Sequence, residues 1–245
     1  MKQPVFCTAG DTAALRNARN ILQKLGYTVS AEPSAAVTHL LLPVPSLEAD
    51  GTVKGGQKLE DVLKTLPEDV TVLGGNLPAL PCRRIDFLQD EFYLGENAAI
   101  TAQCTIRLIQ QHRDRIAGAA VLIIGWGRIG KRLAPLLKES GADVTVAARK
   151  PDALTAASEL GFSVTEAAKW NAQRYDIIIN TAPAPVMDQQ EARPDALLVD
   201  LASIKGIAGD RVIWARGLPN KDAPDASGIL IAKTALRYAL RKEQI

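Results

Sequence analysis

The sequence predicts an α/β protein of two domains, each built on a parallel sheet with helices against it. Short apolar runs alternate along the chain with stretches in which apolar residues recur at helical spacing, the pattern of strand–helix–strand units. The alternation restarts at residues 120–124, where an apolar run ends directly in a glycine-rich turn. At 245 residues the chain is long enough for two such domains to bury separate cores.

Residues 1–95 form the first predicted domain. Its alternation of strand, helix and strand implies a parallel sheet, and we interpret it as a smaller flavodoxin-like α/β unit that lacks a complete glycine motif. Its expected elements are strands at 4–8, 27–29, 37–42 and 70–73, a helix capped by Asp11 or Thr12 that ends at Gly26, a loop at 46–58, a short helix at 59–66 and a last piece at 83–93.

The clearest motif is the glycine turn after the apolar run. Gly125 permits a tight turn, Gly127 lets a pyrophosphate approach the backbone, and Gly130 allows the following helix to pack on the strand. Free N–H groups and the positive end of the helix dipole then face the phosphates. The turn therefore predicts a Rossmann-type dinucleotide site. The expected phosphate-binding residues are Gly125, Gly127, Arg128, Ile129 and Gly130.

The end of the next strand indicates which dinucleotide binds. Arg149 follows Gly130 at close to the spacing of about 20 residues at which NAD-binding proteins place an acidic side chain for the ribose 2′-hydroxyl. A carboxylate would repel a 2′-phosphate, whereas a guanidinium can bind one with two hydrogen bonds. Arg149 and Lys150 therefore favour NADP over NAD, with a solvated strand end as the alternative interpretation.

The second predicted domain covers residues 96–245. It begins with a connecting helix at 96–116, which suggests a hinge between the domains. Although the C-terminal helix, taken as 226–243, belongs to this stretch of sequence, it could pack on the first domain rather than on the second. The remaining expected elements are strands at 120–124, 144–148, 162–164, 176–183, 196–203 and 212–215, and helices after Gly130, at 153–160, at 167–173 and at 223–240.

Composition excludes several classes of function. The formal net charge is +2 with no extended basic field, so we expect no nucleic-acid partner. No apolar run reaches the length of a membrane span or of a signal peptide, so we expect a cytoplasmic protein without membrane contact. Cys7, Cys82 and Cys104 have no metal-ligand spacing, and we expect neither a metal site nor a disulfide.

Six segments match a known pattern in order and spacing: 95–102, 125–130, 148–149, 179–183, 200–203, and 217–219 with 223–224. In these segments the chain resembles the family of dipicolinate synthase A subunits, which is related in architecture to the D-2-hydroxyacid dehydrogenases. The likeness covers roughly residues 95–245 well and the first domain more loosely. Asp-Leu-Ala-Ser at 200–203 together with Gly-Leu-Pro at 217–219 is more specific than the glycine turn.

The resemblance implies NADP-dependent dehydrogenation of a dihydrodipicolinate-type ring to pyridine-2,6-dicarboxylate, by hydride transfer in the cleft between the domains. It also implies a small dicarboxylate substrate, a partner that is the flavoprotein B subunit, and a role in sporulation. In addition, we expect a homo-oligomer, with a dimer through the interdomain helices as its form.

The ends of two further strands supply the remaining candidate residues. Thr181, Ala182 and Pro183 follow the fourth strand, where a nicotinamide ribose would lie; an ordinary strand terminus is the alternative. Ser203 and Lys205 follow the fifth strand, and Lys205 is either a partner for a substrate carboxylate or a solvated loop lysine. The candidate catalytic residues are Ser203, Lys205 and Asp11.

The sequence departs from the family pattern at Gln103, Cys104 and Asp225, where Glu, Gly and Lys are expected. An aspartate in place of a lysine is unfavourable beside a dianionic substrate. His39, predicted inside a strand, and His112, at a charged helix end, do not replace the histidine acid/base of the hydroxyacid dehydrogenases. Two alternatives stay open: a catalytically altered nucleotide-binding regulatory subunit, and a dehydrogenase of another small carboxylated substrate.

Overall fold

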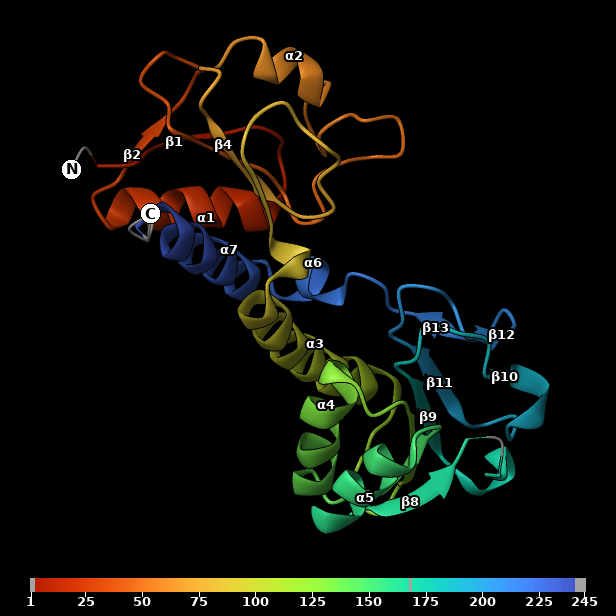
Figure 1. The fold of residues 1–245 in the computed structure, drawn as a ribbon. Coiled ribbons are helices and arrows are strands. Elements are labelled where there is room, and N and C mark those ends of the chain that lie inside the picture. Colours follow the sequence, from red (N-terminus) through yellow and green to blue (C-terminus); the bar gives the residue numbers. More distant parts are fainter. Residues whose placement is uncertain (1–2, 168, 241–245) are drawn as a thin grey trace. The chain divides into compact units, whose positions relative to one another are not determined.

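The computed structural model describes residues 3–167 and 169–240, and the contacts divide the chain into two compact units. Of the described residues, 3–97 and 223–240 make up the first unit, and those between 98 and 222 make up the second. The chain passes from the first unit to the second within α3 (Glu91–His112) (Figure 1). Each unit contains its own parallel sheet, so the predicted α/β fold class is confirmed.

The sheet of the first unit has the strand order β2-β1-β3-β4-β5, and every pairing in it is parallel. The order 2-1-3-4-5 is that of flavodoxin-like folds, as predicted. Its strands are β1 (Val5–Thr8), β2 (Thr28–Ser30), β3 (His39–Leu41), β4 (Thr71–Gly74) and β5 (Arg84–Asp86).

Helices cover this first sheet on both faces. On one face α1 (Ala13–Lys24) and α7 (Pro224–Ala239) lie side by side, and the five-residue α2 (Leu59–Leu63) lies on the other (Figure 1). Gly228 brings the two long helices into close contact, because a Cβ at this position would stand 2.6 Å from Asn17 Cβ and 2.8 Å from the Ala14 carbonyl oxygen. The last helix of the chain is thus part of the first unit.

The sheet of the second unit is six-stranded and parallel, in the order β13-β11-β9-β6-β7-β8. Numbered within the unit and read from β8, this is the order 3-2-1-4-5-6 of the Rossmann fold. Its strands are β6 (Ala120–Ile124), β7 (Asp143–Ala148), β8 (Ser163–Glu166), β9 (Ile177–Asn180), β11 (Leu197–Asp200) and β13 (Ile213–Trp214); its helices include α4 (Arg128–Glu139) and α5 (Pro151–Glu159).

Several elements differ from the sequence prediction. The prediction of a helix at 167–173 is wrong. Residue 168 is not described, and in the rest of the segment the regular element is the 3-10 turn η2 (Ala172–Arg174). This short turn forms because the Asn171 side chain accepts a hydrogen bond from Gln173 N at 3.0 Å. Helix α3 begins at Glu91, earlier than expected, because the Asp90 carboxylate caps it by accepting from Tyr93 N at 2.7 Å. Unpredicted short elements are η1 (Phe87–Gln89), β10 (Met187–Asp188), η3 (Gln189–Glu191), β12 (Ile207–Ala208) and α6 (Leu218–Asp222).

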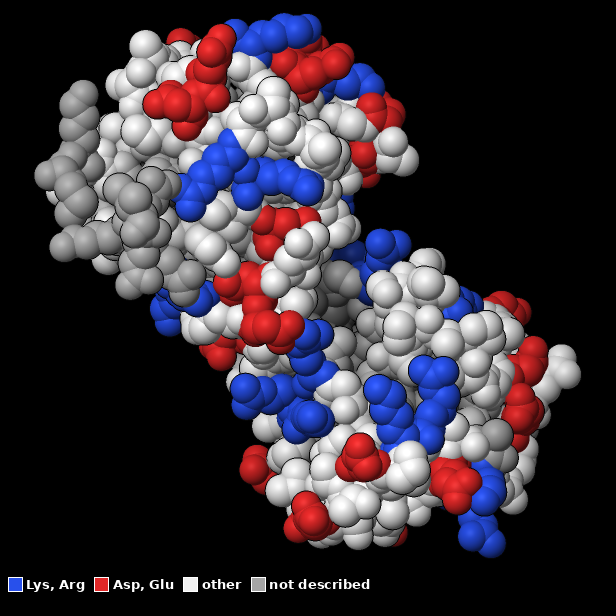
Figure 2. Space-filling model, in the orientation of Figure 1, with Lys and Arg blue, Asp and Glu red and all other residues white. Residues whose placement is uncertain are grey.

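The described part of the chain has neither a membrane-spanning helix nor a metal-binding group of side chains. None of its helices combines the length and the apolar character needed to cross a membrane. Its three cysteines are free thiols, and no group of His, Cys, Asp and Glu side chains in it could hold a metal ion. On the face in Figure 2, acidic and basic side chains are interspersed over each unit.

Candidate functional site: a nucleotide cavity at the glycine turn

The three glycines between β6 and α4 have three different structural roles. Gly125 has φ +108°, and a Cβ there would stand 2.5 Å from Thr181 Oγ1, so the turn tolerates no side chain. A Cβ on Gly130 would collide with the Gly125 carbonyl oxygen, so the helix could not approach the strand. At Gly127 the space that a Cβ would occupy is open, and this residue is the N-cap of α4, which has no side-chain cap. The start of α4 therefore carries no N-cap side chain that would stand in the way of a bound anion.

A cavity of about 470 Å³ lies at this turn, within the second unit. It is lined by residues 124–127, by the end of β7 and the start of α5, and by residues 181–186 after β9. In the sheet, β6 lies between β7 and β9, and the chain changes direction there. Ligands of open parallel sheets bind at this switch point, beyond the carboxyl ends of the strands.

Two basic side chains line the same cavity. Arg149 and Lys150 are both exposed and follow directly after β7. Among the described residues neither forms an ion pair, so both charges remain available to an anion. Gly125, Gly127, Arg149, Lys150, Thr181, Ala182 and Pro183 thus share one cavity, whereas Arg128, Ile129 and Gly130 lie in the first turn of α4 and do not line it.

Two tryptophans complete the cavity wall. Trp126 is 8% exposed and meets the Phe162 ring edge-on at 5.7 Å. Trp170 packs against the apolar core beneath β6, β9 and β11. The cavity therefore combines a glycine turn without side chains, two cations and aromatic surface, which are features that suit a pyrophosphate, a 2′-phosphate and a flat ring.

Comparisons with known proteins agree with this geometry. Residues 95–192 match the family model described as D-isomer specific 2-hydroxyacid dehydrogenase, NAD binding domain. The chain is 29% identical to the A subunit of dipicolinate synthase from Bacillus subtilis over 224 residues, which cover 83% of this chain and 75% of the relative. The resemblance to the family of dipicolinate synthase A subunits is confirmed.

Crystal structures of this family share the fold. The structure of the dipicolinate synthase A subunit from Bacillus halodurans matches with a TM-score of 0.84 at 23% identity, over 98% of each chain. The corresponding structure from Bacillus subtilis matches with a TM-score of 0.83 at 22% identity, over 97% of this chain and 96% of that one. Together with the family model, the fold supports a dehydrogenase-like protein with a nicotinamide dinucleotide as cofactor.

The threonine after β9 fastens the glycine turn. Its hydroxyl donates to the Ile124 carbonyl at 3.0 Å and lies 3.3 Å from the Gly125 carbonyl oxygen. Thr181 therefore links the end of β9 to the end of β6. To donate to a ribose, as the sequence prediction has it, this hydroxyl must leave a backbone partner.

The family motif Asp-Leu-Ala-Ser, residues 200–203, begins with a buried residue and ends with an exposed one. Asp200 is fully buried, and its carboxylate accepts from the backbone N–H groups of residues 202, 206 and 207. Ser203 is exposed, and the Lys205 ammonium donates to the Gly209 carbonyl at 2.6 Å. Neither of these two predicted catalytic residues lines the nucleotide cavity.

Sequence reasoning did not select Asp200 or its buried neighbour Asn180 as functional residues. A signal was present, since each is a polar residue that ends an otherwise apolar strand.

The third predicted catalytic residue, Asp11, belongs to the first unit. Its exposed carboxylate pairs with Arg16, and its backbone N–H donates to the Lys54 carbonyl at 2.9 Å. Asp225, one of the departures from the family pattern, lies in the same unit and accepts from the Asn17 amide at 2.6 Å. This aspartate joins α7 to α1, which explains its presence without reference to a substrate. Of the other two, Cys104 is fully buried in α3 and Gln103 is exposed.

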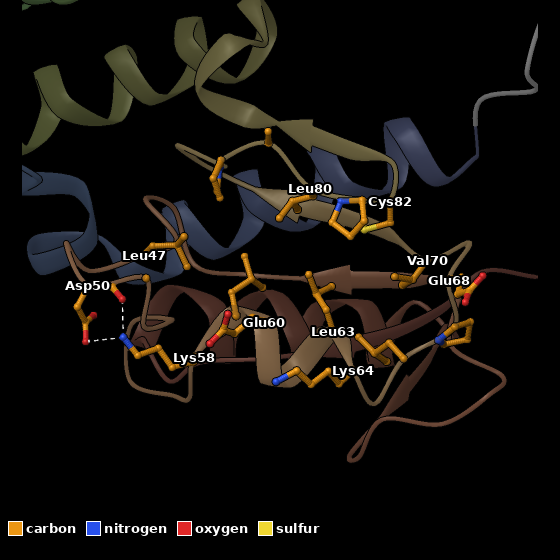
Figure 3. Close-up of a pocket in the computed structure, with 17 residues that line it drawn as sticks. Leu47, Asp50, Lys58, Glu60, Leu63, Lys64, Glu68, Val70, Leu80 and Cys82 are labelled. Atoms are coloured by element: carbon orange, nitrogen blue, oxygen red, sulfur yellow. Dashed lines mark hydrogen bonds and ion pairs between the residues drawn. The ribbon is translucent and has the colours of Figure 1, made fainter.

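A larger cavity, of about 740 Å³, lies between α2 and the 78–82 segment of the first unit (Figure 3). Leu47, Leu63 and Leu80 give it an apolar lining, and Lys58 at its edge is paired with Asp50 at 3.2 Å. Hydrogen bonds from the Thr52 N–H and hydroxyl and from Lys58 lower the pKa of Asp50 to about 2. Burial raises the pKa of the Cys82 thiol, so this cysteine is not a reactive thiolate near neutral pH. The nucleotide cavity is the better candidate although it is smaller.

Proposed function

We propose that the chain is an NADP-dependent oxidoreductase of the dipicolinate synthase A type, which dehydrogenates a dihydrodipicolinate-type ring to pyridine-2,6-dicarboxylate. The observation that carries the proposal is the nucleotide cavity, with open backbone at Gly127 and two exposed cations at Arg149 and Lys150. When bound, the nicotinamide supplies the acceptor for the hydride that a partly reduced ring gives up on becoming aromatic.

The chain's own residues divide the work of binding. The N–H groups at the start of α4 hold the pyrophosphate, because Gly127 at the N-cap has no side chain and leaves space for it. Arg149 and Lys150 hold the 2′-phosphate. Thr181, Ala182 and Pro183 face the nicotinamide half, and Pro183 turns the chain away from the sheet there. Packed apolar residues behind the tryptophans exclude water from one side of the cavity.

The substrate-side roles go to Ser203, Lys205 and Asp11. A substrate carboxylate would take the Lys205 ammonium from the Gly209 carbonyl, because an ion-paired hydrogen bond is stronger than one to a neutral oxygen. The exposed Ser203 hydroxyl supplies a donor on the same loop. The relative from Bacillus subtilis is named as one component of a synthase, which supports a second component for this chain. For it we propose the flavoprotein B subunit, together with a homodimer of this chain in the cytoplasm of a sporulating cell.

Calorimetric titration and a turnover assay test this proposal. The titration should give saturable heat with NADP and a weaker response to NAD. The assay follows nicotinamide reduction at 340 nm with a mixture that generates dihydrodipicolinate, with and without a flavoprotein partner. Turnover that depends on the ring substrate supports the reaction, and nucleotide binding without turnover of this ring contradicts it.

A second function is favoured by one observation, the engagement of Asp225 with Asn17 where the family pattern has a lysine. A chain without that cation is a weaker receptor for two carboxylates. The alternatives are a regulatory subunit that binds the nucleotide without catalysis, and a dehydrogenase of another small carboxylated substrate. Nucleotide binding with no turnover of any ring acid would support the regulatory subunit. Nucleotide binding with turnover of a monocarboxylate would support the dehydrogenase of another substrate.

A further inference from the structure

A buried carboxylate at the end of β11 organises the loop that follows. Asp200 is 0% exposed. One of its oxygens accepts from Ala202 N at 3.0 Å, and the other from Gly206 N at 2.7 Å and Ile207 N at 2.9 Å. Among the described residues no lysine or arginine pairs with it. A buried carboxylate without a counterion is stabilised by its hydrogen bonds alone. The loop must therefore hold these three N–H groups within hydrogen-bond distance of Asp200.

The neighbouring strand ends in a second buried polar residue. Asn180 is 0% exposed, and its Nδ2 donates to Asp200 Oδ2 at 3.1 Å. The Asn180 side chain also forms two hydrogen bonds to Ala182. Its Oδ1 accepts from the Ala182 N–H at 2.9 Å, and its Nδ2 donates to the Ala182 carbonyl at 3.0 Å. Ala182 lines the nucleotide cavity. One hydrogen-bonded pair thus holds both the cavity loop, residues 181–186, and the motif loop, residues 201–207.

The two loops also touch directly. A Cβ on Gly206 would collide with the Ala184 carbonyl oxygen and stand 2.5 Å from Asn180 Nδ2. Val186 N donates to the Gly206 carbonyl at 2.8 Å. Because there is no free space at this junction, a displacement of the cavity loop is passed to the motif loop.

We propose that Asn180 and Asp200 are a positioning pair that couples nucleotide binding in the cavity to the conformation of the motif loop. Both side chains are fully buried, and the pair acts through Ala182 on one side and through the N–H groups of residues 202, 206 and 207 on the other. The nucleotide side of this coupling rests on the proposed function. The hold of the pair on the motif loop does not.

The tryptophans provide separate reporters for the two sides. Trp214 Nε1 donates to the Ala202 carbonyl at 3.1 Å, so its indole senses the motif loop, and it does not line the nucleotide cavity. Trp126 and Trp170 do line it. The sequence has only these three tryptophans. Labelling with 5-fluorotryptophan therefore gives one resonance for the loop and two for the cavity, assigned by single Trp→Phe changes.

The experiment compares the wild type, D200N and the control D210N by ¹⁹F NMR and calorimetry, each with and without NADP. D200N keeps the size of the side chain but sets an amide NH₂ against the N–H groups that Asp200 accepts. Asp210 is an exposed aspartate of the same region that accepts from Gln189. We expect NADP to move the Trp214 resonance of the wild type and of D210N together with the cavity resonances. In D200N we expect Trp214 to shift before NADP is added, to respond little afterwards, and affinity to fall about tenfold.

Each outcome bears on one side of the proposal. A Trp214 resonance in D200N that matches the wild type, with an intact response to NADP, overturns the positioning pair. If the cavity resonances of the wild type shift with neither NADP nor NAD, the proposed function and the nucleotide side of the coupling are overturned. The comparison of D200N with the wild type without nucleotide still tests whether the pair positions the motif loop. If D200N does not fold, G206A serves instead, because it keeps both polar groups and forces the loops apart. An unchanged Trp214 resonance in G206A contradicts the proposal.

Discussion

Each unit of this molecule has a glycine at its first strand–helix turn, and the two turns differ in what lies above them. In the first unit Gly10 has φ +93°, and a Cβ on it would stand 2.6 Å from the Lys54 carbonyl oxygen. The Thr12 hydroxyl caps α1 by accepting from Leu15 N at 3.3 Å. In the second unit Gly125 is equally crowded, but nothing lies within 4 Å of a Cβ built on the N-cap residue Gly127, and α4 has no side-chain cap.

The difference shows that one architecture can either close or open the end of its sheet. The first unit places residues 53–56 against its own turn, and the Thr12 side chain caps its helix by accepting from Leu15 N. The second has no side-chain cap on its helix and open space at Gly127, beside two exposed cations. Anion binding at a helix N-terminus needs space and no competing N-cap side chain, and of these two turns the second has both.

The strongest test of this contrast is G127D. The backbone at Gly127 is extended and its surroundings are open, so an aspartate fits and supplies the missing cap. We expect the melting temperature to stay level or rise, while NADP affinity falls about 100-fold, or about 2.8 kcal/mol, because the carboxylate occupies and repels the phosphate position. Calorimetry and thermal melting measure the two effects. A loss of stability in parallel with the loss of binding would contradict the open-turn interpretation.

R149D tests the charge at the edge of the cavity. An aspartate repels a 2′-phosphate and can accept from a 2′-hydroxyl, so the ratio of NADP to NAD affinity should fall on the order of 100-fold. R174D is a suitable control, because Arg174 is exposed in the same unit and does not line the cavity. Titration of both variants with each nucleotide gives the ratio. An R149D variant with the wild-type ratio would make Arg149 a surface residue.

Each unit also contains a carboxylate that should make stability fall in acid. In the second unit the pKa of Asp176 is lowered, first by a hydrogen bond from the Ala120 N–H and then by the positive charges of Arg193 and Arg113. Burial raises the pKa of Asp90 in the first unit, but hydrogen bonds from Tyr238 and Tyr93 and the charge of Arg237 outweigh it, and the net pKa is low.

For both groups the folded pKa lies below the unfolded value of about 3.9, so their contribution is complete above that pH and is lost as pH falls through the folded pKa. We expect D176N and D90N each to lower the free energy of unfolding at neutral pH by about 1 kcal/mol and to reduce its dependence on acid pH. Urea unfolding at a series of pH values measures this. An acid dependence equal to that of the wild type in both variants would remove these carboxylates from the account.

The smallest effect is expected for T12A. Loss of the cap on α1 should cost about 1 kcal/mol of stability. NADP affinity should not change, because this turn is closed by its own chain. Reduced affinity in T12A, with the protein still folded, would mean that the closed turn also takes part in nucleotide binding.

Local pattern was sufficient to predict the segments whose signals agree with one another. The apolar run of β6, the glycines after it and the helical spacing of Leu133 and Leu137 all indicate the same strand, turn and helix, and the structure has them. Prediction failed where a single side chain decides a boundary. The Asp90 cap starts α3 at Glu91, and the Asn171 turn replaces the helix expected at 167–173.

The site was predictable only in part, because a sequence does not reveal what a polar side chain contacts. The motif and the basic residues after β7 were found from spacing. The partners of Thr181, Lys205 and Asp225 are backbone carbonyls or a residue on another helix, and no spacing rule points to them. Asn180 and Asp200 meet only because β9 and β11 are neighbours in the sheet.

The measurement that bears most directly on the central claim is a calorimetric titration of the folded wild-type chain with NADP, with G127D titrated alongside. The account predicts saturable binding of one nucleotide per chain, tighter than that of NAD, and its loss in G127D without loss of fold. Absence of heat with either nucleotide on folded protein, or equal binding by G127D, would contradict the claim that the open turn of the second unit holds the cofactor.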